Sequence, residues 1–429
     1  MERTAVIGSG IAGLAAAREL SREPDGRSVT LFEAAAHFGG HANTVDVTLD
    51  GVTHGVDTGF LVYNERTYPR LIRLFAELGV ETVPSDMSFS VQARGHGLEW
   101  SGSNLAGVFS QRRNLLRPAF WRMLADIVRF NRLASGLAPR IDAATFEQTV
   151  GEFLDQHRFG REFRQWYFLP MIGCIWSCPS EQMLSFPVAT LIRFCHNHGL
   201  LQIANRPQWM TVRNGSTQYV RRIVERLDDA RLHTPVLDVK RGKAGALVKT
   251  AGGAEHFDHV VFACHTDQTL QLLGADATPA EVQVLGAIRY QPNRAVLHTD
   301  ASLLPSRRSA WAAWNYESSS AGGEAGVCLH YLLNRLQPLP WRRPVIVSLN
   351  ALREPRADTV IQRFDYDHPV FDVGAIAAQR RLPEIQGRRR TWFCGAWVGY
   401  GFHEDGLSSG LAVAQALSQE VPVTQRVAA

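Results

Sequence analysis

Lysine is almost absent from this chain. Among its 429 residues, lysine occurs only at Lys240, Lys243 and Lys249, so nearly all of the positive charge is arginine. The planar arginine side chain suits phosphate contacts because it donates two parallel hydrogen bonds, but a GC-rich genome would produce the same bias and is the cause we favour. The formal net charge of +4 is too small to predict nucleic-acid binding.

Cysteine is scarce as well. Six cysteines in a chain of this length do not form the dense, regular pattern of a disulfide framework. One local cluster could imitate a metal site, and its members are Cys174, Cys178, Cys195, His196 and His198. Its spacing matches no standard zinc motif, so we expect buried thiols and local polar contacts here, and no metal ion.

Long apolar runs are also missing. No segment approaches the ~18 consecutive apolar residues that a membrane-spanning helix requires, although 45% of the residues are apolar and can fill a large core. The first predicted strand begins by residue 4, which leaves no room for a signal peptide before it. We therefore expect a cytoplasmic protein, with peripheral attachment to the cytoplasmic face of the inner membrane as an option.

The first 33 residues contain a nucleotide-binding pattern. A short apolar run precedes a Gly-x-Gly-x-x-Gly motif, a helix with one apolar face follows it, and a second predicted strand ends in an acidic residue. The three glycines and the acid are Gly8, Gly10, Gly13 and Glu33. In a dinucleotide-binding β-α-β unit the first glycine permits a tight turn, the second lets the backbone approach a pyrophosphate, and the third lets the helix pack on the strand. The helix N-terminus faces the phosphates, and the acid accepts hydrogen bonds from a ribose.

Two motifs downstream identify the dinucleotide. Residues 38–44 contain a Gly-Gly turn, and residues 56–60 read Val-Asp-Thr-Gly-Phe. Both resemble the superfamily of FAD-dependent amine oxidases, protoporphyrinogen oxidases and phytoene desaturases. The resemblance implies that the cofactor is FAD and that it contacts Gly8, Gly10, Ile11, Ala12, Gly13, Glu33, Ala34, Gly39, Gly40, His41, Thr58, Gly59, Phe60, Leu61 and Val236.

Residues 391–410 resemble the second flavin-binding segment of that superfamily. They predict a strand at 391–394, a glycine-rich turn, and a helix from about 406 to 418. In the superfamily this segment passes over the flavin, and the helix N-terminus stabilises the negative charge of the reduced ring. The resemblance adds Gly395, Glu404, Asp405 and Leu407 to the expected cofactor contacts.

The chain departs from flavin amine oxidases at one position. Those enzymes usually place a lysine near flavin N5, whereas the three lysines here lie on a predicted hairpin on the adenine side, and Asn293 and Arg294 stand close to the expected position. This departure disfavours amine oxidation. The chain also has a single Gly-x-Gly-x-x-Gly motif, so we expect electrons to leave to oxygen, a quinone or a protein partner rather than to arrive from a nicotinamide.

The order of predicted elements indicates an α/β fold. We expect a Rossmann-like FAD-binding domain of the glutathione-reductase type and a discontinuous α+β substrate domain. The FAD-binding domain would comprise residues 1–80, 205–288 and 385–420, and the substrate domain residues 81–204 and 289–384.

Four segments resemble one branch of the superfamily more closely. These segments, residues 56–64, 290–300, 313–316 and 401–405, resemble predicted oxidoreductases that are often encoded beside cyclopropane-fatty-acid-synthase-like methyltransferases. The resemblance implies desaturation of a methyl-branched fatty acyl chain on the route to furan fatty acids, and we expect a phospholipid to carry this chain. It also implies a fatty acyl methyltransferase as a partner.

Desaturation requires a proton acceptor beside the flavin. His403 and Glu404 are the candidate catalytic residues, with His41 and Tyr63 behind them, because an imidazole or a carboxylate can accept the proton. Two alternatives stay open. One is oxidation of another apolar molecule, such as a carotenoid or a porphyrinogen, and the other is a non-catalytic FAD subunit that serves a methyltransferase as a scaffold or electron donor.

Residues 112–134 predict an amphipathic helix. Six arginines surround its apolar stripe against a single acid, Asp126, and the stripe consists of Leu116, Phe120, Met123, Leu124 and Ile127. Such a helix can lie in a membrane interface, with apolar residues among the acyl chains and cations on the phosphates. The commoner arrangement is an ordinary helix that packs its stripe on the core.

Overall fold

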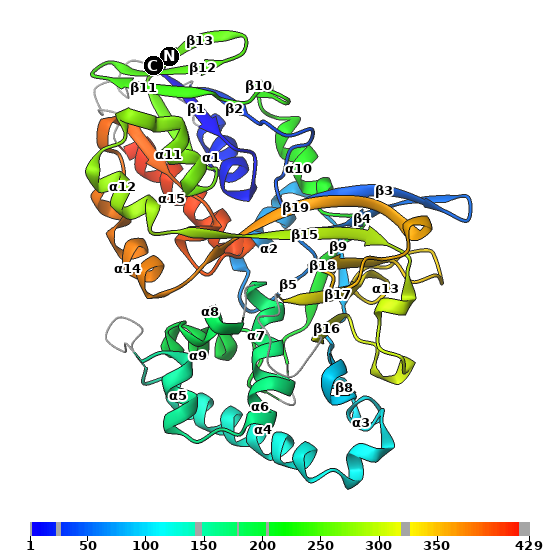
Figure 1. The fold of residues 1–429 in the computed structure, drawn as a ribbon. Coiled ribbons are helices and arrows are strands. Elements are labelled where there is room, and N and C mark those ends of the chain that lie inside the picture. The colour runs from blue at the N-terminus through cyan, green and yellow to red at the C-terminus, as the bar shows by residue number, and fades with distance from the viewer. Residues whose placement is uncertain are drawn as a thin grey trace.

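The computed structural model describes residues 2–22, 27–141, 148–177, 180–202, 206–318 and 327–419. Figure 1 shows a body of strands and helices at the top, which contains the first and the last described segments of the chain. Long strands cross the middle of the molecule, and a group of helices lies below them.

Five parallel strands form the first sheet, in the spatial order β10-β2-β1-β14-β20. Side chains alternate between its two faces, so Val6 lies in one hydrophobic core while Ala5 and Ile7 lie in another. Both faces are apolar because helices cover both of them. The strands are β1 (Arg3–Ile7), β2 (Ser28–Phe32), β10 (Asp229–Arg231), β14 (His259–Phe262) and β20 (Thr391–Phe393).

Helices on the two faces of this sheet belong to separate cores. One core contains α1 (Ile11–Ser21), α2 (Pro69–Leu78), α10 (Thr217–Val224) and α15 (His403–Gln419). The other contains α11 (Thr266–Leu273), α12 (Pro279–Gly286), α14 (Val373–Arg381) and the antiparallel strands β11 (Asp238–Gly242), β12 (Gly245–Thr250) and β13 (Gly253–Phe257). This layered parallel sheet confirms the expected α/β fold with a Rossmann-like domain.

The second sheet has seven strands in the order β19-β15-β18-β17-β16-β7-β8. Its described pairings are antiparallel except for the parallel one between β7 and β16. The strands are β7 (Phe89–Ala93), β8 (Leu98–Ser101), β15 (Arg289–His298), β16 (Trp314–Ser318), β17 (Cys328–Leu332), β18 (Ile346–Leu349) and β19 (Val360–Val370).

The remaining strands connect the two bodies. They are β3 (Thr44–Leu49), β4 (Val52–Asp57), β5 (Tyr63–Asn64), β6 (Thr82–Ser85) and β9 (Trp209–Val212), and the short helix α13 (Leu333–Leu336) follows β17. The parallel sheet draws its strands from the segments that the sequence assigned to FAD, and the seven-stranded sheet from the substrate segments. The β3–β4 hairpin departs from that division, because Val47 and Val56 lie in the core of the second body.

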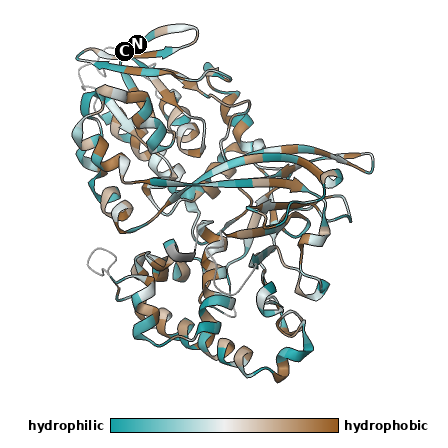
Figure 2. Cartoon of the chain, viewed as in Figure 1, coloured by the Kyte–Doolittle hydropathy of each residue, from teal (hydrophilic) through white to brown (hydrophobic). Residues whose placement is uncertain are grey.

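The helices below the second sheet are α3 (Leu105–Val108), α4 (Pro118–Leu137), α5 (Val150–Gln156), α6 (Arg161–Phe163), α7 (Leu169–Trp176), α8 (Ser180–Leu184) and α9 (Val188–Asn197). Hydrophobic and hydrophilic residues are mixed along α4 (Figure 2). None of the helices in the described ranges is both long enough and apolar enough to cross a bilayer.

The predicted helix over residues 112–134 is two elements. A 3-10 turn covers Arg112–Leu116, and the α-helix begins at Pro118, because the residue before a proline disfavours helical backbone angles. The apolar stripe expected on this helix packs mostly inward: Phe120 and Met123 are buried in the core, and Leu124 and Ile127 pack against it. Leu116 is the exception, with 89% of its surface exposed.

Candidate active site

A cavity of about 960 Å³ lies where the two bodies meet. Loops at the carboxyl ends of the parallel strands form one side of it, which is where open α/β sheets bind ligands. Its lining includes most of the expected cofactor contacts, namely Gly8, Gly10, Ile11, Ala12, Glu33, Ala34, Gly39, Gly40, His41, Thr58, Gly59, Phe60, Leu61, Val236 and Gly395.

The loop from β1 to α1 has the geometry of a phosphate-binding turn. Gly8 has φ +103°, a conformation that side chains disfavour, and a Cβ on Gly13 would lie 1.9 Å from the carbonyl oxygen of Gly8. Gly13 therefore packs helix on strand and does not line the cavity. A Cβ on Gly10 would meet nothing within 4 Å, and no side chain caps α1 at this residue. The N–H groups of the first helical turn are thus available to an anion.

Glu33 is held in position at the end of β2. Its Oε2 accepts hydrogen bonds from the Ser9 N–H at 3.0 Å and the Ser9 hydroxyl at 2.5 Å, and its Oε1 accepts one from the Ala35 N–H at 2.8 Å. The carboxylate therefore holds the phosphate loop through Ser9, and Glu33 also lines the cavity. The sequence did not single out Ser9, and its place between two motif glycines was the only available signal.

The Gly-Gly turn joins the phosphate loop to the segment after β4. The Gly39 N–H donates to the Ser9 hydroxyl at 3.1 Å. The Phe60 N–H donates to the His41 carbonyl at 2.6 Å, and a Cβ on Gly59 would lie 2.4 Å from that same oxygen. Side chains larger than hydrogen are therefore excluded at Gly59, where the two loop segments lie in direct contact.

His41 lines the cavity and has a buried nitrogen without a hydrogen-bond partner in the described protein. This nitrogen is Nε2, and the His41 ring lies beside those of Tyr366 and His368, with centroids 4.9 and 5.2 Å away. Burial holds the pKa of His41 well below its ordinary value, and His368, His265 and His403 lower it further. Because buried polar atoms are almost always paired and His41 lines the cavity, this nitrogen is available to a polar group bound there.

Asn293, which stands in the sequence close to the position expected for the lysine of amine oxidases, is buried on β15. Its side-chain amide donates to the Gln291 carbonyl at 2.9 Å and to Nδ1 of His368 at 3.1 Å, and its own oxygen accepts from Asn350 at 2.7 Å. His368 therefore carries its proton on Nε2, and burial lowers its pKa to about 4. The sequence did not single out Tyr366 or His368, although both lie on one face of β19.

His403 lines the cavity at the start of α15. Its ring stacks on that of Phe60 with centroids 3.6 Å apart, and its Nε2 lies 3.0 Å from the Tyr219 hydroxyl. Burial lowers the pKa of His403 to about 3, so the imidazole is unprotonated near neutral pH. The catalytic role predicted for this residue remains a prediction, with a geometry that permits it.

Glu404 has a different position from the one expected. Its two carboxylate oxygens accept hydrogen bonds from the N–H groups of Arg70 and Leu71, both at 3.0 Å, and so cap the start of α2. It does not line the cavity. The adjacent His403 faces the cavity instead, because consecutive residues of a helix point about 100° apart.

Asp405 and Leu407 support the turn rather than lining the cavity. Asp405 Oδ2 accepts from the Phe402 N–H at 2.9 Å, and burial raises the pKa of this carboxyl to about 6. Leu407 is buried in the core that α15 shares with α1. Gly410 makes that contact close, since a Cβ there would lie 2.1 Å from the Ala12 carbonyl oxygen.

The second half of the cavity is apolar. It extends from the nucleotide-binding loops to α7, α9 and the seven-stranded sheet, and among its walls are Phe89, Ile175, Trp176, Phe194, Trp314 and Leu349. None of the described lining residues is lysine or arginine, and the only acids among them are Glu33 and Asp367. One end of the cavity is therefore a nucleotide cradle, and the other is a largely uncharged chamber.

The family of flavin-containing amine oxidoreductases matches residues 11–323, more than half of the sequence. The chain belongs to this family. It is an FAD-dependent oxidoreductase, and the expected superfamily, enzyme class and cofactor are confirmed. The open helix N-terminus, the oriented Glu33 and the unpaired His41 nitrogen fit FAD in the cradle.

Known relatives of this flavoenzyme differ in the substrates that their names suggest. AofH of Mycobacterium tuberculosis, a candidate flavin-containing monoamine oxidase, is 27% identical over 335 residues, which cover 76% of this chain and 69% of AofH. Cyclohexylamine oxidase from Brevibacterium oxydans IH-35A has a TM-score of 0.70 at 16% identity, covering 98% of this chain and 99% of that one.

Two further solved structures share the fold. A candidate protoporphyrinogen oxidase from Exiguobacterium sp. 255-15 has a TM-score of 0.69 at 19% identity, and the CLA-producing fatty acid isomerase from P. acnes has a TM-score of 0.67 at 13% identity. Each covers 98% of this chain and 99% of its own. At such identities the likeness establishes the fold alone.

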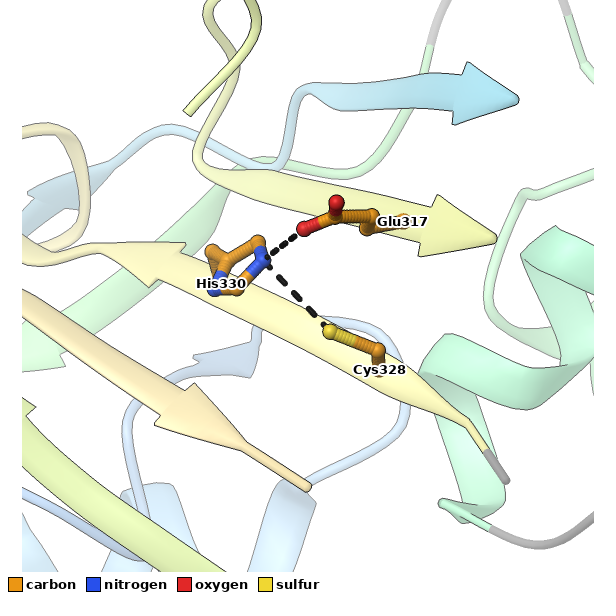
Figure 3. A group of neighbouring side chains, drawn as sticks. All are labelled: Glu317, Cys328 and His330. Carbon is orange, nitrogen blue, oxygen red and sulfur yellow. Dashed lines mark hydrogen bonds and ion pairs between the residues drawn. The ribbon is translucent and has the colours of Figure 1, made fainter. Parts of the chain in front are cut away.

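Outside the cavity, Glu317, Cys328 and His330 form a buried group whose ligand atoms lie within 4.8 Å of one another (Figure 3). His330 Nε2 lies 2.9 Å from a Glu317 oxygen and 3.5 Å from the Cys328 sulfur. Burial raises the pKa of the Cys328 thiol to about 12. Burial also raises the pKa of Glu317, but hydrogen bonds from His330 and Arg94 outweigh it and leave the carboxyl below its ordinary value.

The hydrogen bonds around this group run in one direction. The Asp300 N–H donates to His298 Nδ1 at 3.0 Å, so His298 carries its proton on Nε2 and donates to the Ser348 hydroxyl at 2.7 Å. Ser348 in turn donates to His330 Nδ1 at 2.6 Å, which places the His330 proton on Nε2, toward Glu317. Every member is satisfied, and the nitrogen nearest the acid is a donor. We therefore interpret the group as a structural hydrogen-bond network and not as a metal site.

The cysteine–histidine cluster noted in the sequence is only partly described. Cys178 lies outside the described residues, while Cys174 and Cys195 are buried free thiols. His198 donates from Nδ1 to the Phe194 carbonyl at 3.0 Å and stacks on that ring. Buried thiols and a local polar contact are what the sequence predicted for Cys174, Cys195 and His198.

Proposed function

We propose that this flavoenzyme desaturates a methyl-branched, unsaturated fatty acyl chain carried on a phospholipid. The observation that carries the proposal is the apolar chamber that continues from the FAD cradle between α7, α9 and the seven-stranded sheet. A chamber lined by aromatic and aliphatic side chains favours a hydrocarbon over a polar metabolite, because apolar surface is stabilised by leaving water.

The charges of the chamber favour an ester over a free acid. A fatty acid carboxylate drawn into the cavity would need a cation, and the described lining offers neither lysine nor arginine. An acyl chain esterified to a phospholipid has no such requirement, because its charged head group stays outside. We therefore propose the phospholipid-bound form of the substrate.

The same lining argues against a cationic amine substrate. None of the three lysines lines the cavity, and Asp367 is the only described acid that lines it besides Glu33. The name of AofH suggests an amine, whereas that of the P. acnes isomerase states a fatty acid. The apolar lining suits the acyl chain of such a substrate, and the absence of a lining cation favours its esterified form.

In the proposed reaction the acyl chain loses two hydrogens. One allylic C–H bond breaks and releases its proton to a base, a neighbouring C–H bond breaks and releases hydride, and a conjugated diene remains. FAD, when bound, accepts the hydride with its two electrons. His403 is the candidate base because its unprotonated ring lines the cavity beside Phe60. In the tautomer whose Nε2–H donates to the Tyr219 hydroxyl, Nδ1 is the nitrogen that would take the proton.

The substrate must itself be the product of a methyl transfer to an unsaturated acyl chain. We therefore place this enzyme after a fatty acyl methyltransferase, which is the proposed partner. The reduced enzyme would return its electrons to oxygen, a quinone or a protein.

Anaerobic mixing of the yellow holoenzyme with single candidate substrates tests the proposal. A phospholipid with a methyl-branched monounsaturated chain should bleach the flavin absorbance, while the matching free fatty acid should act far more slowly. Benzylamine, a carotene and a porphyrinogen are the comparison substrates. Bleaching by the amine alone would restore amine oxidation, bleaching by a carotene or porphyrinogen alone would assign the chamber to that substrate, and bleaching by none would contradict the proposal.

A further inference from the structure

The outer face of α4 carries apolar side chains that the core does not use. Trp121, Ala125, Val128 and Arg132 lie four, three and four residues apart, on one line along the helix. Trp121 and Val128 are 49% and 47% exposed. The inward stripe of α4 already fills the core, so packing within this chain does not account for the outer face.

Neighbouring elements extend this face. Leu116 is 89% exposed and Leu115 48% exposed in the 3-10 turn before α4. Leu105 on α3 is 78% exposed, and α3 is held beside α4 by Phe109, whose ring centroid lies 5.6 Å from that of Trp121. We call the set of Leu105, Leu115, Leu116, Trp121 and Val128, together with Arg112, Arg113, Arg117, Arg122 and Arg132, the α4 surface.

The cations of the α4 surface differ in their contacts. Arg122 pairs with Glu162, and Arg117 lies over the ring of Trp166. Arg112 and Arg132 are exposed and have no ion pair among the described residues. The surface thus combines exposed apolar side chains with unneutralised guanidinium groups.

We propose that the α4 surface docks on an anionic phospholipid bilayer. Guanidinium groups bind phosphate oxygens bidentately, exposed leucine, valine and tryptophan side chains insert at the acyl boundary, and tryptophan is favoured at that depth. A second copy of this chain is a poor occupant, because a twofold interface places the same patch on both subunits and would oppose arginine to arginine. Anionic lipid supplies the complementary charge.

The location of the α4 surface suits this role. The helix lies at the edge of the molecule away from the parallel sheet (Figures 1 and 2), and it packs on α6 and α9. Residues of α9 also line the apolar chamber. Docking through α4 therefore sets the helices around the chamber next to the bilayer. The inference does not depend on which substrate is oxidised, because binding is measured without turnover.

Flotation of the holoenzyme with lipid vesicles tests the docking surface. The wild type should float with vesicles that contain phosphatidylglycerol, and less with pure phosphatidylcholine or in high salt, which screens the charges. Leu116→Gln/Val128→Gln should lower the partition coefficient about tenfold. Arg112→Gln/Arg132→Gln should lower it about fivefold for each arginine removed. These four side chains carry no described hydrogen bond or ion pair, so the fold should survive.

Matched controls keep the test falsifiable. Leu247→Gln/Val282→Gln and Arg388→Gln alter exposed residues of the same types elsewhere, and they should bind vesicles as the wild type does. The proposal is overturned if the wild type does not float, or if both α4 variants partition like the controls. It is also overturned if light scattering shows a dimer that Leu116→Gln/Val128→Gln converts to a monomer, since a second copy would then cover the surface.

Discussion

The ring of His403 stacks on the ring of Phe60, with centroids 3.6 Å and planes 15° apart. Phe60 comes from the segment after β4 and His403 from the first residue of α15, so the stack joins the two ends of the sequence at the wall of the cavity. The Tyr219 hydroxyl fixes the orientation of the imidazole from the other side.

Replacement of His403 by glutamine should slow flavin reduction by the lipid about 100-fold, because general-base catalysis typically contributes at least that factor. FAD content should stay unchanged, since the glutamine amide can still meet Tyr219. Tyr219→Phe is the matched control: it removes the hydrogen bond to His403 but keeps the ring, and should slow reduction much less. Stopped-flow absorbance under anaerobic conditions measures both variants, and an unchanged rate in His403→Gln would remove the assignment.

Glu33→Ala should weaken FAD binding about 10- to 100-fold. The substitution removes the carboxylate that holds Ser9 and faces the cavity, and hydrogen bonds to charged groups contribute about 1.5–3 kcal/mol each. Fluorescence titration of the apoprotein with FAD measures the change. Glu77→Gln, which alters an ion-paired acid on α2, is the control and should bind FAD normally. Equal affinity in Glu33→Ala and the wild type would show that the cradle is not the FAD site.

Gly410→Ala should destabilise the protein by about 1–3 kcal/mol. The added methyl group would lie 2.1 Å from the Ala12 carbonyl oxygen, so α15 and α1 would have to separate. Gly136→Ala is the control, at an exposed position of α4 where a Cβ meets nothing within 4 Å. It should stabilise the protein by about 0.5–1 kcal/mol, because alanine favours helical backbone over glycine. Urea unfolding distinguishes the two, and equal stability of both variants would contradict the close contact.

The nucleotide cradle was predictable from sequence because its geometry is local. Gly8, Gly10, Gly13 and Glu33 lie within one β-α-β unit, and each glycine has a steric reason that the structure bears out at Gly8 and Gly13. The sequence also located β1, β2 and β20 of the parallel sheet. These elements have apolar runs of their own, which reveal them without knowledge of their partners.

The parts that were missed depend on distant pairing. Strand β19 contains Gln362, Arg363 and a proline, so it does not read as a buried strand, and it is an edge strand that pairs only with β15 among the described strands. It supplies Tyr366 and His368 to the cavity. Glu404 was placed beside the flavin by its motif, but its partners, the N–H groups that start α2, lie more than 300 residues away in the sequence.

Acid should destabilise the protein between pH 7 and pH 5. Burial lowers the pKa of several histidines. Below about pH 6.5 these histidines therefore bind protons in the unfolded chain but not in the folded chain. This stability is present above pH 6.5 and is lost as pH falls, on the order of 2 kcal/mol for each histidine by pH 5. The histidines, with pKa values of about 4, 4, 4 and 3, are His198, His298, His368 and His403.

Two carboxyl groups oppose this trend. Burial raises the pKa values of Asp57 and Asp405 to about 6, so the folded chain binds protons below pH 6 that the unfolded chain takes up only near pH 4. Protonation of these two carboxyl groups increases the free energy of unfolding as the pH falls. Four histidines act in the opposite direction, so the net effect of acid is destabilising. Thermal unfolding of the holoenzyme should therefore give a lower Tm at pH 5 than at pH 7, and a flat or rising Tm would contradict the assignment of unprotonated buried histidines.

The most direct test of the proposed oxidation is a single anaerobic turnover with one equivalent of methyl-branched monounsaturated phospholipid per FAD. Mass spectrometry of the recovered lipid should show the loss of two hydrogens from the branched acyl chain, in an amount equal to the flavin bleached. Unchanged lipid beside flavin that stays oxidised, or flavin bleached by an amine with the lipid intact, would contradict it.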